Sequence, residues 1–351
     1  MQVTVIPGRD LGAALAQTWR RIQNSNADLY SPYFAPEFTS VVAATRNDVE
    51  IALIQEGGEV VAFFPFQRES KTVGRAVGHP LSDYHGVICA PDLIFDPLEL
   101  LRACKLVAWD FDHLLASQKC FMPFHRAAEQ SPQMDLANGY DAYVAERRQA
   151  GSEQIKKCLT QMRAIEREVG PLHFIAHSSD PTLLQKALAW KSLQYLKSDK
   201  QDLFALSWTR TLIERLHATQ TEDFSGMLSA LYAGDKLIAV HLGMRSRTVL
   251  HYWFPSYDEE MARYSPGLLL LLKMAEHAPS VGLRVIDLGK GMSLYKERLM
   301  NASVMLARGS VELPSWLSFR RGVERRLRTL VKNSPLGGPL RRVMRRSRRM
   351  G

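Results

Sequence analysis

One order of predicted elements occurs twice in this chain, and this repetition constrains the fold more than any other feature. Each half has the pattern of a strand, two helices, an antiparallel hairpin, a further strand, a helix and a last strand. Gly57-Gly58 and Gly234-Asp235 supply the hairpin turns. No residue-level repeat accompanies the shared order. The pattern predicts an α/β (α+β) fold in which mixed, mostly antiparallel sheets are covered by helices.

The length agrees with a duplication, because 351 residues exceed what one hydrophobic core usually supports. We expect a first domain over 1–140, a helical connector over 141–170, a second domain over 171–312 and a basic tail over 313–351. The connector is rich in charge, poor in apolar residues and interrupted at Gly151. The hydrophobic fraction of 46% and the charged fraction of 23% exclude a disordered, collagen-like or coiled-coil chain.

Periodicity and turn residues give approximate bounds for the expected elements. In the first half we expect strands at 3–6, 49–55, 60–67, 86–89 and 113–116, and helices at 11–22, 36–45 and 97–109. In the second half we expect strands at 172–176, 226–233, 237–244, 248–254, 284–288 and 303–311, and helices at 181–196, 208–219, 266–277 and 293–300.

Charge is concentrated at the C-terminal end. Residues 320–351 contain eleven Arg and one Lys against one acid. Because this stretch contributes +11 and the whole chain carries +9, the rest of the protein is nearly neutral. The basic pI therefore reflects the C-terminal tail and gives little information about the charge of an active site elsewhere in the chain.

The chain has the features of a protein that stays in a reducing compartment. Its four cysteines, Cys89, Cys104, Cys120 and Cys158, are widely spaced and form no Cys-x-x-Cys pair, so we expect free thiols and no zinc framework. The N-terminus lacks an export signal, and the apolar run Leu268–Leu272 is far shorter than the ~20 residues of a membrane span. We expect a cytoplasmic protein.

The strand at 237–244 carries the first candidate site residue. Ile238, Val240, Leu242 and Met244 share one apolar face, while Ala239, His241 and Gly243 share the other. Small residues beside a histidine leave room for a ligand. The alternative is a core histidine bonded to a neighbour, since a tight turn would place His241 opposite His251 or Tyr252.

Two further segments concentrate polar groups near the same predicted sheet. Tyr264-Ser265-Pro266-Gly267 opens a helix whose N-terminus suits a phosphate, although most capped helix starts bind nothing. Asp287-Leu288-Gly289-Lys290-Gly291 follows a strand and leads to Tyr295-Lys296. The alternative to a functional role is structural, in which Asp287 only caps the turn after the strand. The loop 79–85, with Asp83 and Tyr84, is a candidate pocket wall or an ordinary surface turn.

Several familiar motifs are absent from the sequence. Gly289-x-Gly291 lacks the remaining features of a dinucleotide fingerprint, and there is no Walker loop or nucleophile elbow. His173 and His177 could share a strand face, but spacing supplies no third ligand. We therefore expect no metal.

Four short motifs then occur in a distinctive order: Tyr257-Asp258, Tyr264-Ser265-Pro266-Gly267-Leu268-Leu269, Asp287-Leu288-Gly289 and Tyr295-Lys296. On these motifs the stretch 223–299 resembles the CelD-like acetyltransferases of bacterial cellulose and exopolysaccharide gene clusters, a branch of the GNAT acyltransferase superfamily. Segments 31–38 and 143–170 are also similar, so the resemblance covers most of 30–312. The doubling resembles the FemAB-type peptidyltransferases.

The resemblance implies two tandem GNAT-like domains and acyl transfer from acetyl-coenzyme A, or another acyl-coenzyme A, to an amine or hydroxyl. In such enzymes a splayed strand pair holds the pantetheine and a helix N-terminus holds the pyrophosphate. The implied donor-binding residues are Tyr252, Phe254, Tyr264, Ser265, Gly267, Leu268 and Lys296. The implied catalytic residues are Tyr295, as the acid that protonates the leaving thiolate, and His241 and Asp287, as candidate bases. The implied acceptor-binding residues are Asp83, Tyr84 and Asp258.

We interpret the chain as an acyltransferase acting on a sugar or sugar-linked acceptor in bacterial polysaccharide biosynthesis. One alternative is a FemAB-like aminoacyl or peptidyl transferase that uses aminoacyl-tRNA, for which the basic tail would contact RNA. The other is a non-catalytic GNAT-like adaptor docked at a membrane or a nucleic acid.

The tail has its own pattern. Trp316, Phe319, Val323, Leu327 and Leu330 recur at helical spacing, with arginines largely elsewhere around the helix, and a second basic run follows from Arg341 to Arg349. This pattern suits an anionic membrane, which would place the protein at the inner membrane face. Packing of the stripe against the second domain is the alternative. Nucleic acid is disfavoured because the tail has few aromatic residues for base stacking.

Overall fold

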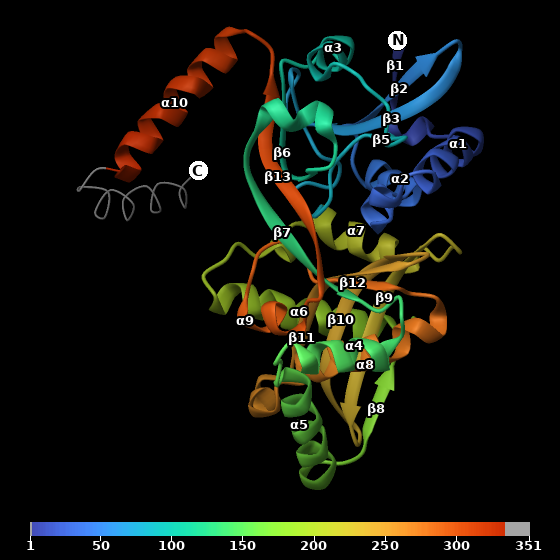
Figure 1. Cartoon of the computed structure of the whole chain (residues 1–351), viewed down its shortest axis with the longest axis vertical. Coiled ribbons are helices and arrows are strands. Elements are labelled where there is room, and N and C mark those ends of the chain that lie inside the picture. The colour runs from blue at the N-terminus through green and yellow to red at the C-terminus, as the bar shows by residue number, and fades with distance from the viewer. Residues whose placement is uncertain (1, 334–351) are drawn as a thin grey trace.

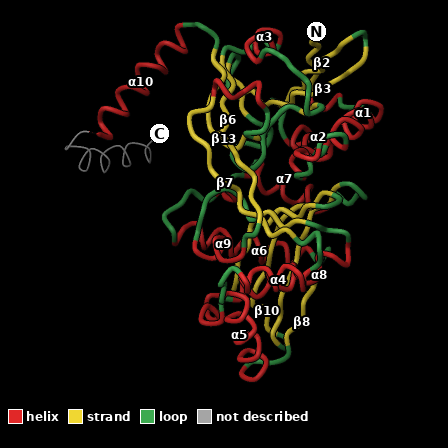
Figure 2. The backbone as a smooth tube through the Cα atoms, viewed as in Figure 1, coloured by secondary structure: helices red, strands yellow, loops and turns green. Residues whose placement is uncertain are grey.

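The computed structural model describes residues 2–333 (Figures 1 and 2). The elements of the first half are β1 (Gln2–Pro7), α1 (Ala13–Asn24), α2 (Pro36–Thr45), β2 (Val49–Glu56), β3 (Glu59–Arg68), β4 (Val73–Arg75), β5 (Ile88–Cys89), α3 (Pro97–Ala103), β6 (Ala108–Leu115) and β7 (His125–Asp135). Two helices, α4 (Tyr140–Gln149) and α5 (Gln154–Glu168), follow and are separated at Gly151, as expected. Gly151 has a φ of +78°, which glycine adopts without a steric penalty.

The second half has the expected order. Its elements are β8 (Leu172–Ile175), α6 (Pro181–Lys197), α7 (Ser207–Ala218), β9 (Phe224–Ala233), β10 (Lys236–Ser246), β11 (Val249–Tyr257), α8 (Pro266–His277), β12 (Val285–Asp287), α9 (Leu294–Leu299), β13 (Ala302–Glu312) and α10 (Trp316–Asn333).

Several details of the first half differ from expectation, among them the short strand β4, which was not expected. The helix expected over 97–109 ends at Ala103, and a strand begins at Ala108. Lys105, with a φ of +54°, lies in the turn between them, and a non-glycine residue in this conformation ends a helix. The strand β7 was not expected, because five of its first six residues are exposed and its sequence does not alternate apolar and polar residues.

One continuous sheet replaces the two expected sheets. Within the described residues its order is β1-β2-β3-β4-β6-β13-β7-β12-β11-β10-β9-β8, and β5 pairs with β3. The last strand, β13, lies between β6 and β7, and β7 pairs in turn with β12. The long strands β7 and β13 therefore run together through the middle of the molecule and join the halves (Figure 1). This arrangement places loops of the first half beside strands of the second.

Each half contains one short parallel strand pair. In the second half β11 pairs with β12 at only three positions, from Val249↔Val285 to His251↔Asp287, and β11 then continues to Tyr257 without β12. In the first half β4 and β6 pair in parallel from Val73↔Ala108 to Arg75↔Asp110. The strands of such a pair diverge where the pairing ends, and the resulting V is a natural place for a ligand in an open sheet.

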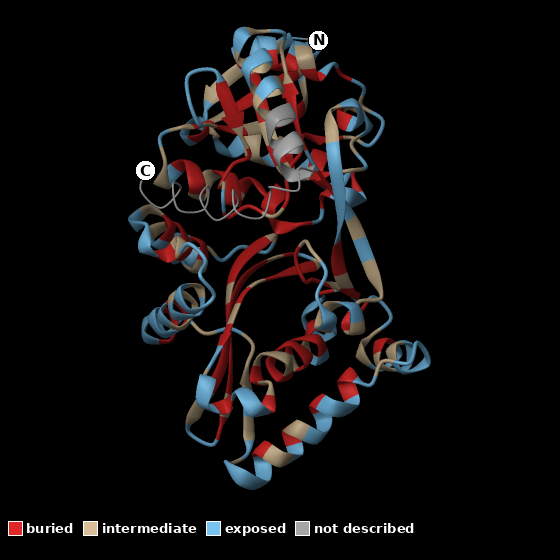
Figure 3. Ribbon diagram, turned by 90° about the vertical axis from the view of Figure 1, so that its left-hand side faces the viewer, coloured by how far each residue is buried: buried red, intermediate tan, exposed pale blue. Residues whose placement is uncertain are grey.

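Helices cover the sheet on both faces. Helices α6 and α7 pack on β9, β10 and β11 in a core that also includes α1 and α2, while α5 and α8 pack with the opposite side of the second half. Buried residues are concentrated in the strands and on the helix faces that pack against them (Figure 3).

Helix α10 leaves the end of β13 and projects away from the sheet (Figure 1). Its existence was expected from the apolar spacing of residues 316–330. The second basic run, Arg341 to Arg349, lies outside the described residues. Over the described part of the chain, no helix combines the length and hydropathy that a membrane crossing requires.

Candidate active site

The V between β11 and β12 opens into a groove of about 680 Å³. One wall is the unpaired end of β11, the other is the loop after β12 with the start of α9, and the first turn of α8 closes one end. Residues of the first half and of α6 complete the rim. The lining residues are Asp83, His113, Lys191, Gln194, Lys200, Tyr252, Trp253, Pro255, Tyr257, Ala262, Ser265, Gly267, Leu268, Leu288, Gly289, Lys290, Tyr295 and Lys296.

An irregularity in β11 produces this divergence. The register with β10 shifts between Leu242, which lies opposite Phe254, and Met244, which lies opposite His251. Two residues of β11, Tyr252 and Trp253, therefore face a single residue of β10, which is a β-bulge. Bulges bend a strand and increase its twist, and here the bend falls just beyond the last pair with β12.

His241 stabilises the bulge from within the sheet. Its Nε2 accepts the backbone N–H of Trp253 at 3.2 Å, and its ring stacks on Tyr252 with a centroid distance of 4.6 Å. Gly243 allows this arrangement, because a Cβ at that position would lie 2.5 Å from the imidazole. The space that small residues leave on this strand is thus occupied by the histidine itself.

His241 lies opposite Pro255 and not opposite His251 or Tyr252, because the bulge changes the register. The imidazole is fully buried and does not line the groove. Burial lowers the pKa of His241 to about 3, so the ring is neutral near pH 7.

The first turn of α8 is well suited to approach a ligand. Ser265 adopts a left-handed conformation with a φ of +55°, Pro266 follows at the first helical position, and Gly267 and Leu268 line the groove. The Tyr252 hydroxyl donates to the Gly267 carbonyl oxygen at 3.0 Å, which fixes this turn against β11. The N-terminal N–H groups of a helix favour a phosphate oxygen at such a position.

Tyr295 and Lys296 enter the groove from α9. The Lys296 ammonium donates to the carbonyl oxygen of Gly289 at 2.8 Å, and burial lowers the pKa of this lysine. Burial raises the pKa of Tyr295, so its hydroxyl keeps its proton at neutral pH. A protonated phenol beside the groove can act as an acid.

Asp287 lies behind the groove in a saturated hydrogen-bond network. Its carboxylate accepts bonds from the hydroxyls of Tyr84 and Ser131, the Gln133 amide and the backbone N–H of Gly289. Burial alone would raise its pKa, but the hydrogen bond and charge of His251 outweigh that effect and bring the pKa to about 2. Asp287 is 1% exposed and does not line this groove.

His251 links this buried network to the groove. Its Nε2 lies 2.9 Å from Oδ2 of Asp83, and its Nδ1 lies 3.5 Å from Oδ1 of Asp287. Burial would lower the pKa of His251, yet the two carboxylates raise it to about 9. The ring is therefore an imidazolium near neutral pH, held between two carboxylates.

The remaining residues expected at the site lie outside the groove. Phe254 packs edge-on against Phe204, and the Tyr264 hydroxyl donates to Glu168 at 2.6 Å. Asp258 accepts the backbone N–H of Glu260 and pairs with Lys236 at the start of a short 3-10 helix. Tyr84 faces Asp287 behind the groove. The structure brings Asp83, Tyr252, Ser265, Gly267, Leu268, Tyr295 and Lys296 together.

Among the groove or network residues that sequence reasoning missed are His251, His113 and Lys191. Nε2 of His113 lies 3.6 Å from Oδ1 of Asp83. The Lys191 ammonium donates to the Pro255 carbonyl oxygen at 3.0 Å, and burial lowers its pKa to about 8. These residues come from separate elements, and no spacing in the sequence connects them.

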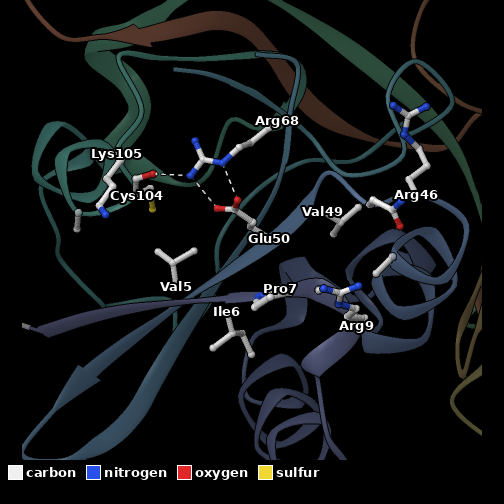
Figure 4. A pocket seen from close by; sticks show the side chains of 14 residues that line it. Val5, Ile6, Pro7, Arg9, Arg46, Val49, Glu50, Arg68, Cys104 and Lys105 are labelled. Carbon is white, nitrogen blue, oxygen red and sulfur yellow. Dashed lines mark hydrogen bonds and ion pairs between the residues drawn. The ribbon is translucent and has the colours of Figure 1, made fainter. Parts of the chain in front are cut away.

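A second hollow, of about 350 Å³, lies in the first half between β1, the end of α2 and the end of α3 (Figure 4). There Arg68 forms two bonds with Glu50 and one with the carbonyl oxygen of Cys104. Burial raises the pKa of the Cys104 thiol to about 12, so this thiol is unreactive. The hollow contains no arrangement of acid, base and nucleophile comparable to that in the groove.

Comparisons with known proteins agree with this geometry. Residues 152–297 match the family model described as an acetyltransferase (GNAT) domain. A search of curated protein sequences gave no match.

Three solved structures share the fold of nearly the whole chain. FemX aligns over 88% of this chain and 96% of its own at 10% identity, with a TM-score of 0.57. A conserved protein of unknown function from Bacteroides thetaiotaomicron aligns over 88% and 100% at 10% identity, with a TM-score of 0.55. The C-terminal domain of an Agrobacterium fabrum protein, described provisionally as a lysylphosphatidylglycerol synthetase, aligns over 87% and 94% at 13% identity, with a TM-score of 0.52.

The matched domain contains β8 to β12, α8 and the groove between them. The fold is a mixed α/β arrangement whose second half is a GNAT domain. The class that this domain defines is the GNAT-type acyltransferase.

Proposed function

We propose that this protein transfers an acyl group, acetyl from acetyl-coenzyme A in the simplest case, to a sugar or sugar-linked acceptor in bacterial polysaccharide biosynthesis. The observation that carries the proposal is the groove between β11 and β12, which ends at the first turn of α8. A thioester donor is long and narrow with a charged end, and this shape suits a groove closed by a helix N-terminus.

The proposal gives a role to residues along the length of the groove. Ser265, Gly267 and Leu268 would hold the pyrophosphate, and Tyr252 with its neighbours on β11 would hold the pantetheine. The acceptor oxygen or nitrogen attacks the thioester carbon, a C–O or C–N bond forms, and the C–S bond breaks. Tyr295 donates its proton to the departing thiolate, which fits a phenol that remains protonated at neutral pH.

The acceptor side of the groove favours a hydroxyl-rich molecule. Asp83 and His113 offer polar atoms there, and Trp253 offers an aromatic surface next to them. Carboxylates bind hydroxyl donors, and aromatic rings pack on the apolar faces of sugar rings. The resemblance to CelD-like acetyltransferases adds polysaccharide assembly as the setting.

Aminoacyl transfer from a charged tRNA is the second candidate, favoured by the similarity of the fold to FemX along the whole chain. The two candidates differ in the donor that the groove accepts. If the first candidate is correct, acetyl-coenzyme A binds in the groove as the donor. If the second is correct, acetyl-coenzyme A does not bind there.

A direct test is a thermal-shift and calorimetric screen of acetyl-, propionyl- and succinyl-coenzyme A. A ligand that binds only the folded state stabilises it by about 2.7 kcal/mol at 100 times its Kd. We expect stabilisation by at least one acyl-coenzyme A, followed by release of free coenzyme A when a glucose oligosaccharide or glucosamine is added. No stabilisation by any of these donors would contradict the proposal.

We also propose that α10 brings the protein to the cytoplasmic face of an anionic membrane. Trp316 is 77% exposed, Phe319 is 62% exposed and Val323 is 42% exposed, so these side chains do not pack against the second half. Arg320 and Arg321 lie on the same helix, which continues through a strongly basic sequence. An apolar stripe with arginines around it fits the interface of an anionic bilayer, where each basic residue adds about 1 kcal/mol.

A further inference from the structure

The V-shaped opening expected between the strands of the first half is filled by another segment of that half. Beyond the short parallel pair of β4 and β6, the segment 85–89 lies between β3 and β6. Ile88 and Cys89 pair with β3 on one side, and His85 bridges Leu114 of β6 on the other. The Gln118 amide clamps this segment by accepting from the backbone N–H of Val87 and donating to its carbonyl oxygen. The V in which the second half has its groove is therefore filled with buried backbone in the first half.

The loop that leads into this segment reaches the groove of the second half. Its residues on both sides of Asp83 are anchored. The Ser82 hydroxyl donates to the Tyr84 carbonyl oxygen at 3.2 Å, the His85 ring contacts the Ser82 carbonyl oxygen at 3.1 Å, and the Tyr84 hydroxyl bonds to Asp287. Asp83 is thus presented from a fixed backbone, which is the condition for a carboxylate to act at one defined point.

The Asp83 carboxylate lies where β11 and β12 begin to diverge. Besides its contact with His251, its Oδ2 lies 3.9 Å from the position that a Cβ on Gly289 would occupy. The side chain retains 27% of its exposure, whereas His241 and Asp287 are buried. Among the described residues that line the groove, Asp83 is the one carboxylate.

We propose that Asp83, supplied by the first half, is the general base of the transfer reaction, and that the buried pair His251–Asp287 positions it. The inference rests on the proposed function. Asp83 accepts the proton of the acceptor hydroxyl or amine as the new C–O or C–N bond forms. The C–S bond breaks, the thiolate takes the proton of Tyr295, and both residues return to their starting states by exchange with solvent.

The positioning pair acts through charge and geometry. The His251 imidazolium holds the Asp83 carboxylate at one edge of its ring, and Asp287 holds the other edge. The two carboxylates and the imidazolium between them are therefore held in one fixed orientation. In this arrangement the first half of the duplication serves the active site of the second and does not act as a second enzyme.

The first experiment uses the full chain with acetyl-coenzyme A as donor and glucosamine, cellobiose or water as acceptor, and measures release of free coenzyme A. Asp83→Asn should lower kcat roughly 10²–10⁴-fold while the Kd for acetyl-coenzyme A stays within twofold. Asp83→Glu should recover part of the rate because it restores a carboxylate. The matched control is Asp92→Asn, an exposed aspartate of the same half, which should behave as wild type.

The second experiment tests the positioning role through the pH profile of kcat/KM. The charged or titratable groups near Asp83 are His251 on β11, His113 on β6, Lys296 on α9, Tyr33 beside α2 and Tyr195 on α6, with Asp287 on β12 behind His251. In wild type, kcat/KM should fall as pH rises through about 9, the pKa of His251, because the ring then loses the proton that holds Asp83, and this basic limb should be absent in His251→Asn. In Asp287→Asn the side-chain amide can still form hydrogen bonds with part of this network. We therefore expect a lower kcat and an unchanged affinity for the donor.

The outcomes are distinguishable. Undiminished turnover by folded Asp83→Asn would overturn the assignment of the base, as would a loss of rate that Asp83→Glu does not recover at all. A basic limb near pH 9 that persists unchanged in His251→Asn would overturn the positioning role. Failure of wild-type protein to bind acetyl-coenzyme A would instead overturn the proposed donor.

Discussion

The hydroxyl of Tyr252 donates a hydrogen bond to the carbonyl oxygen of Gly267 at 3.0 Å, and so fixes the divergent part of β11 to the first turn of α8. Burial raises the pKa of this tyrosine well above its usual range, so the donor proton stays in place at neutral pH. The two walls that would contact a donor's pantetheine and pyrophosphate are thus joined by one bond. Changes near either residue are expected to affect donor affinity.

Tyr295→Phe tests the proposed acid. Because the phenol would protonate the leaving thiolate, we expect turnover to fall roughly 10²–10⁴-fold while donor affinity is nearly unchanged. Initial rates of coenzyme A release and calorimetry of acetyl-coenzyme A give the two quantities. Tyr232→Phe, on β9 outside the groove, is the control. Normal turnover in folded Tyr295→Phe would remove this residue from the mechanism.

Gly267→Val tests the phosphate end of the groove. A Cβ at this position would lie 3.6 Å from Tyr257, so the protein accommodates it, and the branched side chain would then occupy space expected for the donor. We expect donor binding to be lost in calorimetry while the melting temperature changes little. Gly12→Val is the matched control, since Gly12 begins another helix and has open space around it. Preserved affinity with lower stability would show that Gly267 has only a structural role.

Membrane docking by α10 predicts that the protein sediments with anionic liposomes and not with neutral ones, and that added salt weakens the binding. Truncation after Glu312 should abolish sedimentation without reducing donor affinity. A finer test is the double change Trp316→Glu and Phe319→Glu, with Ile94→Glu as a control at another exposed apolar residue. Equal sedimentation of full-length and truncated protein would contradict this docking.

Acid should destabilise the fold through buried neutral histidines. Burial lowers the pKa of His241 and of His85 to about 3 in the folded state, against about 6.5 when unfolded. The unfolded state therefore binds more protons below pH 6.5, and each histidine reduces the free energy of unfolding by about 1.4 kcal/mol per pH unit down to pH 3. Urea unfolding at pH 7, 6, 5 and 4 should show a smaller decrease for His241→Asn than for wild type.

His251 gives the opposite dependence at high pH. Its folded pKa of about 9 exceeds the unfolded value, so its contribution to stability is complete below pH 6.5 and is lost as pH rises through 9. Unfolding between pH 7 and 10 should show this loss in wild type and not in His251→Asn. A wild-type protein with no change in stability over this range would show that the imidazolium is not stabilised between Asp83 and Asp287.

Local signals determined most of the elements. Gly57-Gly58 and Gly234-Asp235 close hairpins, and Ser265-Pro266 starts α8, because turn and cap chemistry depends on neighbouring residues. The alternation in 237–244 correctly indicated a strand. Part of the groove was foreseeable for the same reason, since Ser265, Gly267, Tyr295 and Lys296 line it and lie on or next to such elements.

Only the tertiary structure decided how the halves meet. The strand β7 carries no apolar alternation and owes its strand conformation to pairing with β12 and β13. Asp83 and His251 are 168 residues apart, and their contact depends on that pairing. The sequence by itself determined most of the helices, turns and hairpin strands, because these depend on short-range periodicity and backbone preference. The positions of β7, β13 and Asp83 depend on long-range pairing and burial, which no short stretch of sequence encodes.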